Sequence, residues 1–267
     1  MQATKTEQTT NETEPQLFNL QGKVALVTGA TRGLGFEIGR GLGQAGATVV
    51  VHGRDQSSAA AACDRLRAAG LKASWVAFEL NDRAACQQAF DQLRDTHARL
   101  DILVNNASMR LRKPLTAIDT IELDTIIRTN VLANIEISRA AIALMKLNRY
   151  GRIITISSIA GHIVRSGDFI YPITKQALNT MTRSLAVEFG KDGILSNAIA
   201  PGTFATEFNQ TLIRNPENIA KMQERNPLQR WGSPAEIIGP VLFLASEAAS
   251  YVNGQVLTVD GGFSISF

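Results

Sequence analysis

The stretch Lys23-Val-Ala-Leu-Val-Thr-Gly-Ala-Thr-Arg-Gly-Leu-Gly35 decides the fold of this 267-residue chain. Its first half is a short apolar run followed at once by glycines, which is typical of a buried strand that ends in a tight turn. The glycines follow the pattern G-x-x-x-G-x-G rather than the commoner G-x-G-x-x-G. Such a turn lets the backbone approach a pyrophosphate, which binds at the positive N-terminus of the next helix. The stretch therefore predicts a strand, a dinucleotide-binding turn and a helix.

The rest of the chain alternates short apolar runs with helical patterns. Strands are predicted at 23–28, 48–52, 74–78, 100–104, 152–156, 194–199 and 255–259, and helices at 33–45, 57–69, 83–96, 121–147, 171–189 and 234–246. This alternation requires right-handed crossovers and a parallel sheet that is covered on both faces. We therefore predict an α/β fold with a single doubly wound parallel sheet (Rossmann fold) and helices on both faces.

Domain boundaries follow from the same pattern. Residues 17–267 are predicted to form one catalytic domain, and the polar residues 1–16 a disordered N-terminal tail. Residues 201–232 contain no strand pattern and carry Asn-Pro breakers at 215–216 and 226–227. Because ligands of doubly wound sheets bind beyond the carboxyl ends of the strands, this segment is a candidate substrate lid.

Composition limits the classes of function. The net charge of +3 is too small to attract nucleic acid through a global field, and the apolar stretches fall far short of the roughly 20 residues that span a bilayer. Cys63 and Cys86 lack metal or redox spacing, as do His52, His97 and His162. We expect a cytoplasmic protein with no metal site and no nucleic-acid or membrane partner. His52 and His97 are predicted at the surface, and His162 near the site.

The end of the second strand bears on the choice of dinucleotide. An NAD site would carry an acidic residue about 20 residues after the glycine turn. Here the strand runs into His52-Gly53-Arg54, and no carboxylate occurs before Asp55. The guanidinium of Arg54 suits a phosphate, and Arg32 in the glycine turn reaches the same region. Unless both are merely solvated side chains, the pattern favours NADP(H).

A second motif indicates acid–base chemistry. Tyr171 and Lys175 are four residues apart and share one helix face. A tyrosine phenol has an unperturbed pKa near 10, and a nearby cation favours its phenolate form. Ser158 follows the fifth strand, and Asn105-Asn106-Ala107 ends the fourth, at the same edge of the predicted sheet. Asparagine has a low helix propensity, so Asn130, in an apolar helix, is expected to make a specific contact that favours it there.

These motifs, in this order and together with Pro201-Gly202, resemble the short-chain dehydrogenase/reductase family over residues 18–267. The resemblance implies that Tyr171 is the general acid or base and that Ser158 hydrogen-bonds the substrate oxygen. It implies that Lys175 binds the nicotinamide ribose and that Asn130 holds a water in a proton relay. It also implies a homotetramer acting on a small-molecule substrate.

The cofactor site that the resemblance implies comprises Gly29, Thr31, Arg32, Gly33, Leu34, Gly35, Arg54, Glu79, Leu80, Asn106, Ala107, Tyr171, Lys175, Pro201, Gly202 and Thr203. Two positions depart from the family pattern. Ser108 stands where a glycine usually follows Asn-Asn-Ala, and Glu79 where an aspartate usually follows the third strand.

Within the family, several segments resemble the gluconate 5-dehydrogenases, in which a basic loop after Asn-Asn-Ala faces a sugar-acid carboxylate. Arg110, Arg112 and Lys113 occupy that loop here, and Arg112 aligns best with a basic position of the motif. The resemblance therefore implies Arg112, Ser158 and Tyr171 as substrate residues, and oxidation of a sugar acid or reduction of its 5-keto form. Two alternatives stay open: a 3-oxoacyl thioester reductase whose basic loop receives an acyl carrier protein, and a non-catalytic dinucleotide-binding protein.

Overall fold

A computed structural model of the chain describes residues 17–266; the predicted tail, 1–16, lies outside the described residues. Seven parallel strands form one sheet in the order β3-β2-β1-β4-β5-β6-β7. They are β1 (Val24–Val27), β2 (Thr48–Gly53), β3 (Ala73–Ala77), β4 (Ile102–Asn105), β5 (Gly151–Ile156), β6 (Ile194–Pro201) and β7 (Val256–Val259). The predicted fold class is confirmed.

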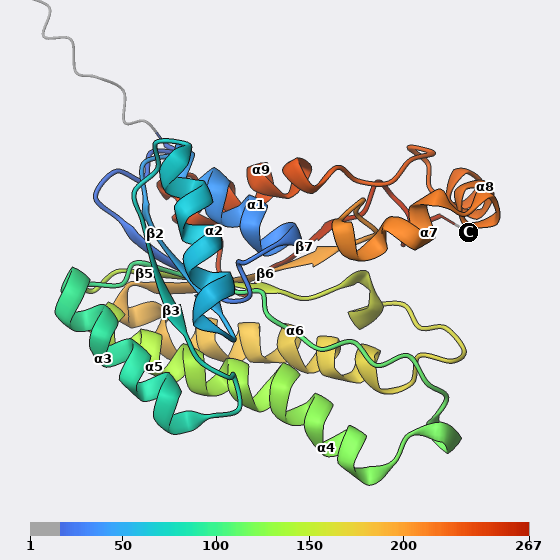
Figure 1. Cartoon of the computed structure of the whole chain (residues 1–267), viewed down its shortest axis with the longest axis horizontal. Helices are drawn as coiled ribbons and strands as arrows, with labels where there is room; N and C mark the ends of the chain where they lie inside the picture. Colours follow the sequence, from blue (N-terminus) through green and yellow to red (C-terminus); the bar gives the residue numbers. More distant parts are fainter. Residues whose placement is uncertain (1–16, 267) are drawn as a thin grey trace, which may run out of the picture.

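Helices cover both faces of this sheet (Figure 1). One face carries α1 (Gly33–Gln44), α2 (Gln56–Ala68) and α9 (Ile238–Ala245), and the other carries α3 (Arg83–His97), α5 (Ala133–Asn148) and α6 (Ile170–Phe189). Successive side chains of β1 alternate between two apolar cores: Ala25 and Val27 pack in the first, and Val24 and Leu26 in the second. Because a strand buried on both faces needs apolar residues at every position, β1 is a continuous apolar run.

The long helix predicted at 121–147 consists of three parts. These are α4 (Thr120–Ile127), the π-helical turn η2 (Arg128–Leu132) and α5. The extent of the prediction is confirmed, but the π-turn was not foreseen. Such turns occur mostly as single insertions in α-helices, often at functional sites. Asn130 lies in this turn and is fully buried.

The two halves of the sheet meet between β1 and β4. Strand β1 pairs with β2 on one side and with β4 on the other, so the chain reverses direction across the sheet at this point. Ligands of doubly wound sheets bind at such a reversal, beyond the carboxyl ends of the strands. The glycine turn after β1 and Asn106 after β4 both lie there.

The remaining elements are short helices and 3₁₀ turns, and three of them lie in the segment after β6. That segment forms η5 (Glu207–Asn209), α7 (Gln210–Arg214) and α8 (Pro216–Arg225), and it extends to one side of the sheet (Figure 1). The other 3₁₀ turns are η1 (Leu115–Ala117), η3 (Ile159–Gly161), η4 (Gly190–Asp192), η6 (Pro234–Ile237) and η7 (Glu247–Ala249). Among the described residues, no helix is both long and apolar enough to cross a membrane.

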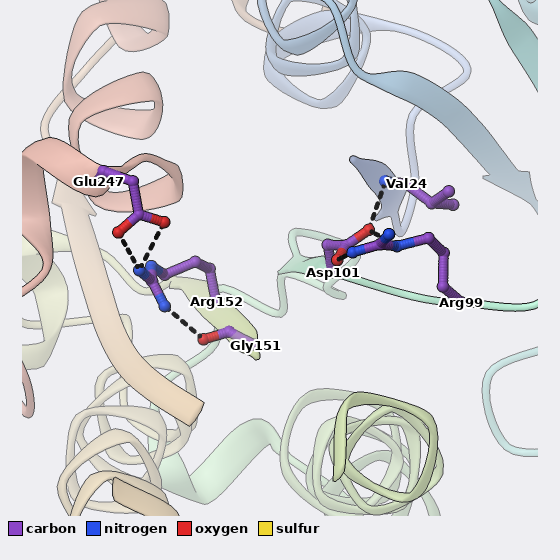
Figure 2. A network of polar contacts seen from close by, with 6 residues as sticks. All are labelled: Val24, Arg99, Asp101, Gly151, Arg152 and Glu247. Carbon is purple, nitrogen blue, oxygen red and sulfur yellow. Dashed lines mark hydrogen bonds and ion pairs between the residues drawn. The ribbon is translucent and has the colours of Figure 1, made fainter. Parts of the chain in front are cut away.

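A polar network holds the amino ends of the strands together, opposite the edge that binds ligands (Figure 2). The buried carboxylate of Asp101 accepts from the backbone N–H of Val24 at 2.8 Å and pairs with Arg99. Arg152, which is 4% exposed, donates to Glu247 of η7 at 3.3 Å. A buried charge is costly unless it is paired, so these contacts make the network a structural element of the sheet.

Candidate active site

A cleft of about 1130 Å³ opens at the carboxyl edge of the sheet. Four of the predicted site residues do not line it: Gly35, Asn130, Arg112 and Thr203. The others do: Gly29, Thr31, Arg32, Gly33, Leu34, Arg54, Glu79, Leu80, Asn106, Ala107, Ser158, Tyr171, Lys175, Pro201 and Gly202. The fold therefore brings the two motifs, which are more than 100 residues apart in the sequence, into one cavity.

The glycine turn needs its glycines for two different reasons. Gly29 and Gly33 have φ of +62° and +58°, a left-handed conformation that disfavours other residues. Gly35 does not line the cleft, and a Cβ added to it would be 2.3 Å from the carbonyl oxygen of Gly29 and 2.4 Å from Nδ2 of Asn106. Asn106 in turn donates to the carbonyls of Thr28 (2.8 Å) and Gly29 (3.1 Å). Gly35 therefore allows the close packing that joins the turn to β4.

His52 is buried at 1% exposure, so its predicted surface position is wrong. Its Nδ1 accepts from the N–H of Gly29 at 3.1 Å, and its Nε2 lies 3.0 Å from the carbonyl oxygen of Phe78. An Nε2–H tautomer satisfies both contacts. Burial lowers the pKa of His52 to about 4, so the ring is neutral at pH 7. His52 thus fixes the start of the glycine turn to the ends of β2 and β3. The exposed His162 does not line the cleft.

One end of the cleft suits a phosphate. Arg32 and Arg54 line it, and within the described residues neither guanidinium has an ion pair or hydrogen bond. The nearby Asp55 caps α2 instead, accepting from the N–H of Ser58 at 2.8 Å. That backbone hydrogen bond, with those from the Ser57 and Ser58 hydroxyls, lowers the pKa of Asp55 to about 2. With the open N-terminus of α1, these residues fit the pyrophosphate and 2′-phosphate of NADP(H).

The other end of the cleft holds the predicted acid–base pair. Lys175 is 2% exposed, and its Nζ donates to the carbonyl of Ile156 at 3.0 Å, which leaves two N–H donors for a ligand. The same Nζ lies 5.5 Å from the ring centroid of Tyr171. The Oγ of Ser158 accepts from the N–H of Ala160 at 3.1 Å, so its own proton is available to a substrate oxygen. The three side chains meet because β5 ends beside the first turns of α6.

Asn130 does not line the cleft, but its side chain contacts residues next to the acid–base pair. Its Oδ1 accepts from the N–H of Met109 at 2.7 Å, and its Nδ2 donates to the Met109 carbonyl (2.8 Å) and the Thr174 hydroxyl (3.1 Å). Asn134 donates to the backbone carbonyl of Asn130 at 2.8 Å. The side-chain amide therefore joins the loop after β4 to α6, and the π-turn places it there.

The three cations of the basic loop have different surroundings. Arg110 lines the cleft, with its guanidinium carbon 5.2 Å from the ring centroid of Tyr171. Lys113 forms an ion pair with Glu122 of α4. Arg112 does not line the cleft, and its Nε lies 3.8 Å from the carboxylate of Asp168. The predicted loop therefore places Arg110 at the cleft wall, but not Arg112 or Lys113.

Asp168 is almost fully buried and lies between two arginines. Its Oδ2 is 3.8 Å from Arg112 and 3.6 Å from Arg165. Burial is the main cause that lowers the pKa of Arg112 to about 10, and the charges of Arg110 and Arg165 lower it further. Arg112 remains protonated at pH 7, in surroundings that favour an additional anion.

Some residues that line the cleft were not predicted from the sequence, because they belong to segments without a recognisable motif. Phe204 and Thr206 line the cleft, whereas the predicted Thr203 does not. Ser58 and Arg65 of α2 also line it. Their seven-residue spacing places both on one helix face, but spacing alone does not say what that face meets. Within residues 17–266, no cluster of three or more His, Cys, Asp or Glu side chains could hold a metal ion.

Comparisons with known proteins agree with this geometry. Residues 29–264 match the profile of a family described as "Enoyl-(Acyl carrier protein) reductase". The chain is 38% identical over 252 residues to a gluconate 5-dehydrogenase of Gluconobacter oxydans, covering 94% of this chain and 98% of that protein. It is 33% identical over 250 residues to a 5-keto-D-gluconate 5-reductase of Escherichia coli K12, with the same coverage of the two chains.

Solved structures resemble this chain in both fold and sequence. A gluconate 5-dehydrogenase from Burkholderia cenocepacia, crystallised in complex with NADP and tartrate, has a TM-score of 0.90 and 34% sequence identity. The match covers 94% of this chain and 98% of that one. The match therefore spans every element that lines the cleft.

Proposed function

The chain belongs to the short-chain dehydrogenase/reductase family, and from that premise we propose that it is an NADP(H)-dependent oxidoreductase acting on a sugar acid of the gluconate/5-ketogluconate type. One observation carries the proposal. Two unpaired arginines line one end of the cleft, and Ser158, Tyr171 and Lys175 line the other. A single extended dinucleotide fits that arrangement.

The mechanism assigns a role to each of these side chains. Lys175 binds the nicotinamide ribose through its two free N–H donors. NADP(H), when bound, supplies or accepts the hydride. In the reductive direction Ser158 donates a hydrogen bond to the substrate carbonyl, and Tyr171 transfers its phenolic proton to the same oxygen. In the oxidative direction Tyr171 takes that proton back. Asn130 positions the loop after β4 against α6; its predicted hold on a relay water stays a prediction.

The sugar-acid class follows from the basic loop and the relatives. Both curated relatives act, by their names, on gluconate or its 5-keto form, and the structural relative holds tartrate, which carries two carboxylates. We assign the substrate carboxylate to the basic loop, with Arg110 at the cleft wall and Arg112 next to it, because the charges of Arg110, Arg112 and Arg165 outnumber the single nearby carboxylate of Asp168. A 3-oxoacyl thioester reductase is the second candidate, favoured by the acyl-carrier-protein description of the family profile. A non-catalytic dinucleotide-binding protein would not need a buried lysine beside Tyr171.

Three further parts of the proposal concern the surroundings of the site. Residues 201–232 form the substrate lid, supported by Phe204, Thr206 and Asn209 at the cleft wall. The chain forms a homotetramer, supported by exposed apolar side chains on α5 and α6, such as Ile135 and Val187, and by the half-exposed edge strand β7. A cytoplasmic location is in keeping with the free, buried thiols of Cys63 and Cys86.

A substrate panel tests the proposed function. We expect NADPH oxidation to be fastest with 5-ketogluconate, and slower with 2-ketogluconate, simple ketoses and an acetoacetyl thioester. We also expect NADPH to be preferred to NADH by at least about tenfold, since one charge-assisted contact to the 2′-phosphate contributes about 1.5–3 kcal/mol. Initial rates by absorbance at 340 nm measure both. Turnover of the thioester alone would move the assignment to the second candidate.

Replacing Arg112 tests the carboxylate assignment. We expect Arg112→Ala to raise the KM for 5-ketogluconate about tenfold, with a smaller change in kcat, because a charge-assisted hydrogen bond is lost from the bound substrate. The matched control is Arg165→Ala, which removes the other, more exposed arginine beside Asp168. Steady-state kinetics of both variants decide the matter, and an unchanged KM in Arg112→Ala excludes the role.

A further inference from the structure

We propose that Arg65 of α2 is a third guanidinium of the site for the 2′-phosphate of NADP(H), held in place by stacking on Phe36. The inference rests on the proposed coenzyme and adds a residue from outside both the glycine turn and the end of β2. Arg65 lines the same cleft as Arg32 and Arg54. It lies 11 residues beyond Arg54, in a helix with no sequence motif for dinucleotides.

The position of Arg65 is set by an aromatic contact. Its guanidinium carbon lies 3.8 Å from the ring centroid of Phe36, well within the range of a cation–π contact. Phe36 follows Arg32 by one turn of α1, and its N–H donates to the Arg32 carbonyl at 3.3 Å. The stack therefore brings Arg65 beside the first turn of α1, next to the arginine of the glycine turn.

Stacking prepares the guanidinium for a phosphate. The N–H donors of a guanidinium lie in its plane, so a ring packed on one face leaves them free at the edges. The contact also restricts the rotamers of a long side chain, which reduces the entropy lost when a ligand is bound. A solvated surface arginine would have neither property.

The charges around Arg65 are unbalanced. The adjacent Asp64 pairs with Arg67 at 3.6 Å. Glu37, which follows Phe36 in α1, pairs with Arg40. Asp55 is engaged by Ser57 and Ser58. Each of these three carboxylates therefore has another partner.

The three guanidinium groups at this end of the cleft have no anionic partner among the described residues. Among residues 17–266, Arg32, Arg54 and Arg65 form no ion pair and no side-chain hydrogen bond. Three like charges at one end of a cleft repel one another and attract an anion. A phosphate monoester, with up to two negative charges and three acceptor oxygens, matches this set, whereas the 2′-hydroxyl of NAD(H) does not.

The test measures binding rather than turnover. We expect Arg65→Gln to weaken the binding of NADPH and of adenosine 2′,5′-bisphosphate about tenfold, by fluorescence titration and calorimetry respectively. Binding of NADH and ADP, which lack the 2′-phosphate, should stay within about twofold. Phe36→Leu keeps the charge but removes the stack, so we expect a loss of about threefold for the same two phosphorylated ligands. The matched control is Arg183→Gln, an exposed arginine of α6 that lies outside the cleft and forms no ion pair with any other residue that the structure describes.

The outcomes separate the inference from its premise. If the wild-type protein prefers NADPH and Arg65→Gln retains that preference in full, the inference is overturned while the coenzyme assignment stands. An equal loss in Arg183→Gln also overturns it, because the effect would then be one of general charge. If the wild-type protein itself shows no preference for the 2′-phosphorylated ligands, the proposed coenzyme fails, and the inference fails with it.

Discussion

Tyr171→Phe is expected to lower kcat for 5-ketogluconate reduction by about 10³-fold, because the variant lacks the proton that the substrate oxygen must receive. The substitution removes one oxygen atom and little else. The Tyr171 ring is 8% exposed and packs with Ile126 and Ile170, contacts that phenylalanine retains. Its hydroxyl makes no hydrogen bond to any other residue that the structure describes. Stability and NADPH affinity should therefore stay close to wild type.

The matched control is Tyr251→Phe, which removes a phenolic hydroxyl from a fully exposed side chain outside the cleft. Its kcat should equal that of the wild-type protein. Single-turnover rates and a thermal melt distinguish a chemical defect from a folding defect. Full activity in Tyr171→Phe would contradict the mechanism and return the non-catalytic alternative to consideration.

Gly35→Ala is expected to raise the Kd for NADPH about 100-fold, since displacing a binding group by about 1 Å has effects of that size. The new Cβ would lie 2.3 Å from the Gly29 carbonyl oxygen and 2.4 Å from Asn106 Nδ2. Neither group yields easily, because His52 holds the N–H of Gly29 and Thr28 accepts from Asn106. The turn must then move away from β4, and we expect a loss of about 2 kcal/mol in the free energy of unfolding as well.

The control for this change is Gly239→Ala in α9. An added Cβ at Gly239 meets nothing within 4 Å, and the residue is helical. Alanine there should stabilise the protein by up to about 1 kcal/mol and leave NADPH binding unchanged. Fluorescence titration and denaturant unfolding of both variants provide the comparison. NADPH binding at wild-type strength in Gly35→Ala would show that the turn tolerates a side chain.

Much of the fold was predictable because it depends on local patterns. Every strand lies at or within two residues of its predicted bounds, since short apolar runs between helical patterns have few alternative structures. The three glycines of the first turn were identified by spacing alone. Ser158, Tyr171 and Lys175 were likewise found by their order along the chain and by their positions at the ends of predicted elements.

The errors and omissions share a different cause. His52 has the same local sequence whether it faces water or Gly29, and only the position of β2 between β1 and β3 buries it. The π-turn around Asn130 follows from its bonds to Met109 and Thr174, which belong to other elements. In the basic loop, Asp168 and Glu122 decide which cation faces the cleft.

The sequence by itself therefore determined the order of the elements, the glycine turn and the shared helix face of Tyr171 and Lys175, because each depends on neighbours within one or two turns of chain. Only the tertiary structure decided which surfaces these elements share. Arg65 is the clearest case: its role depends on Phe36, 29 residues away, and on neighbouring carboxylates that have other partners. Contacts of this kind form between elements, so no pattern within one element encodes them.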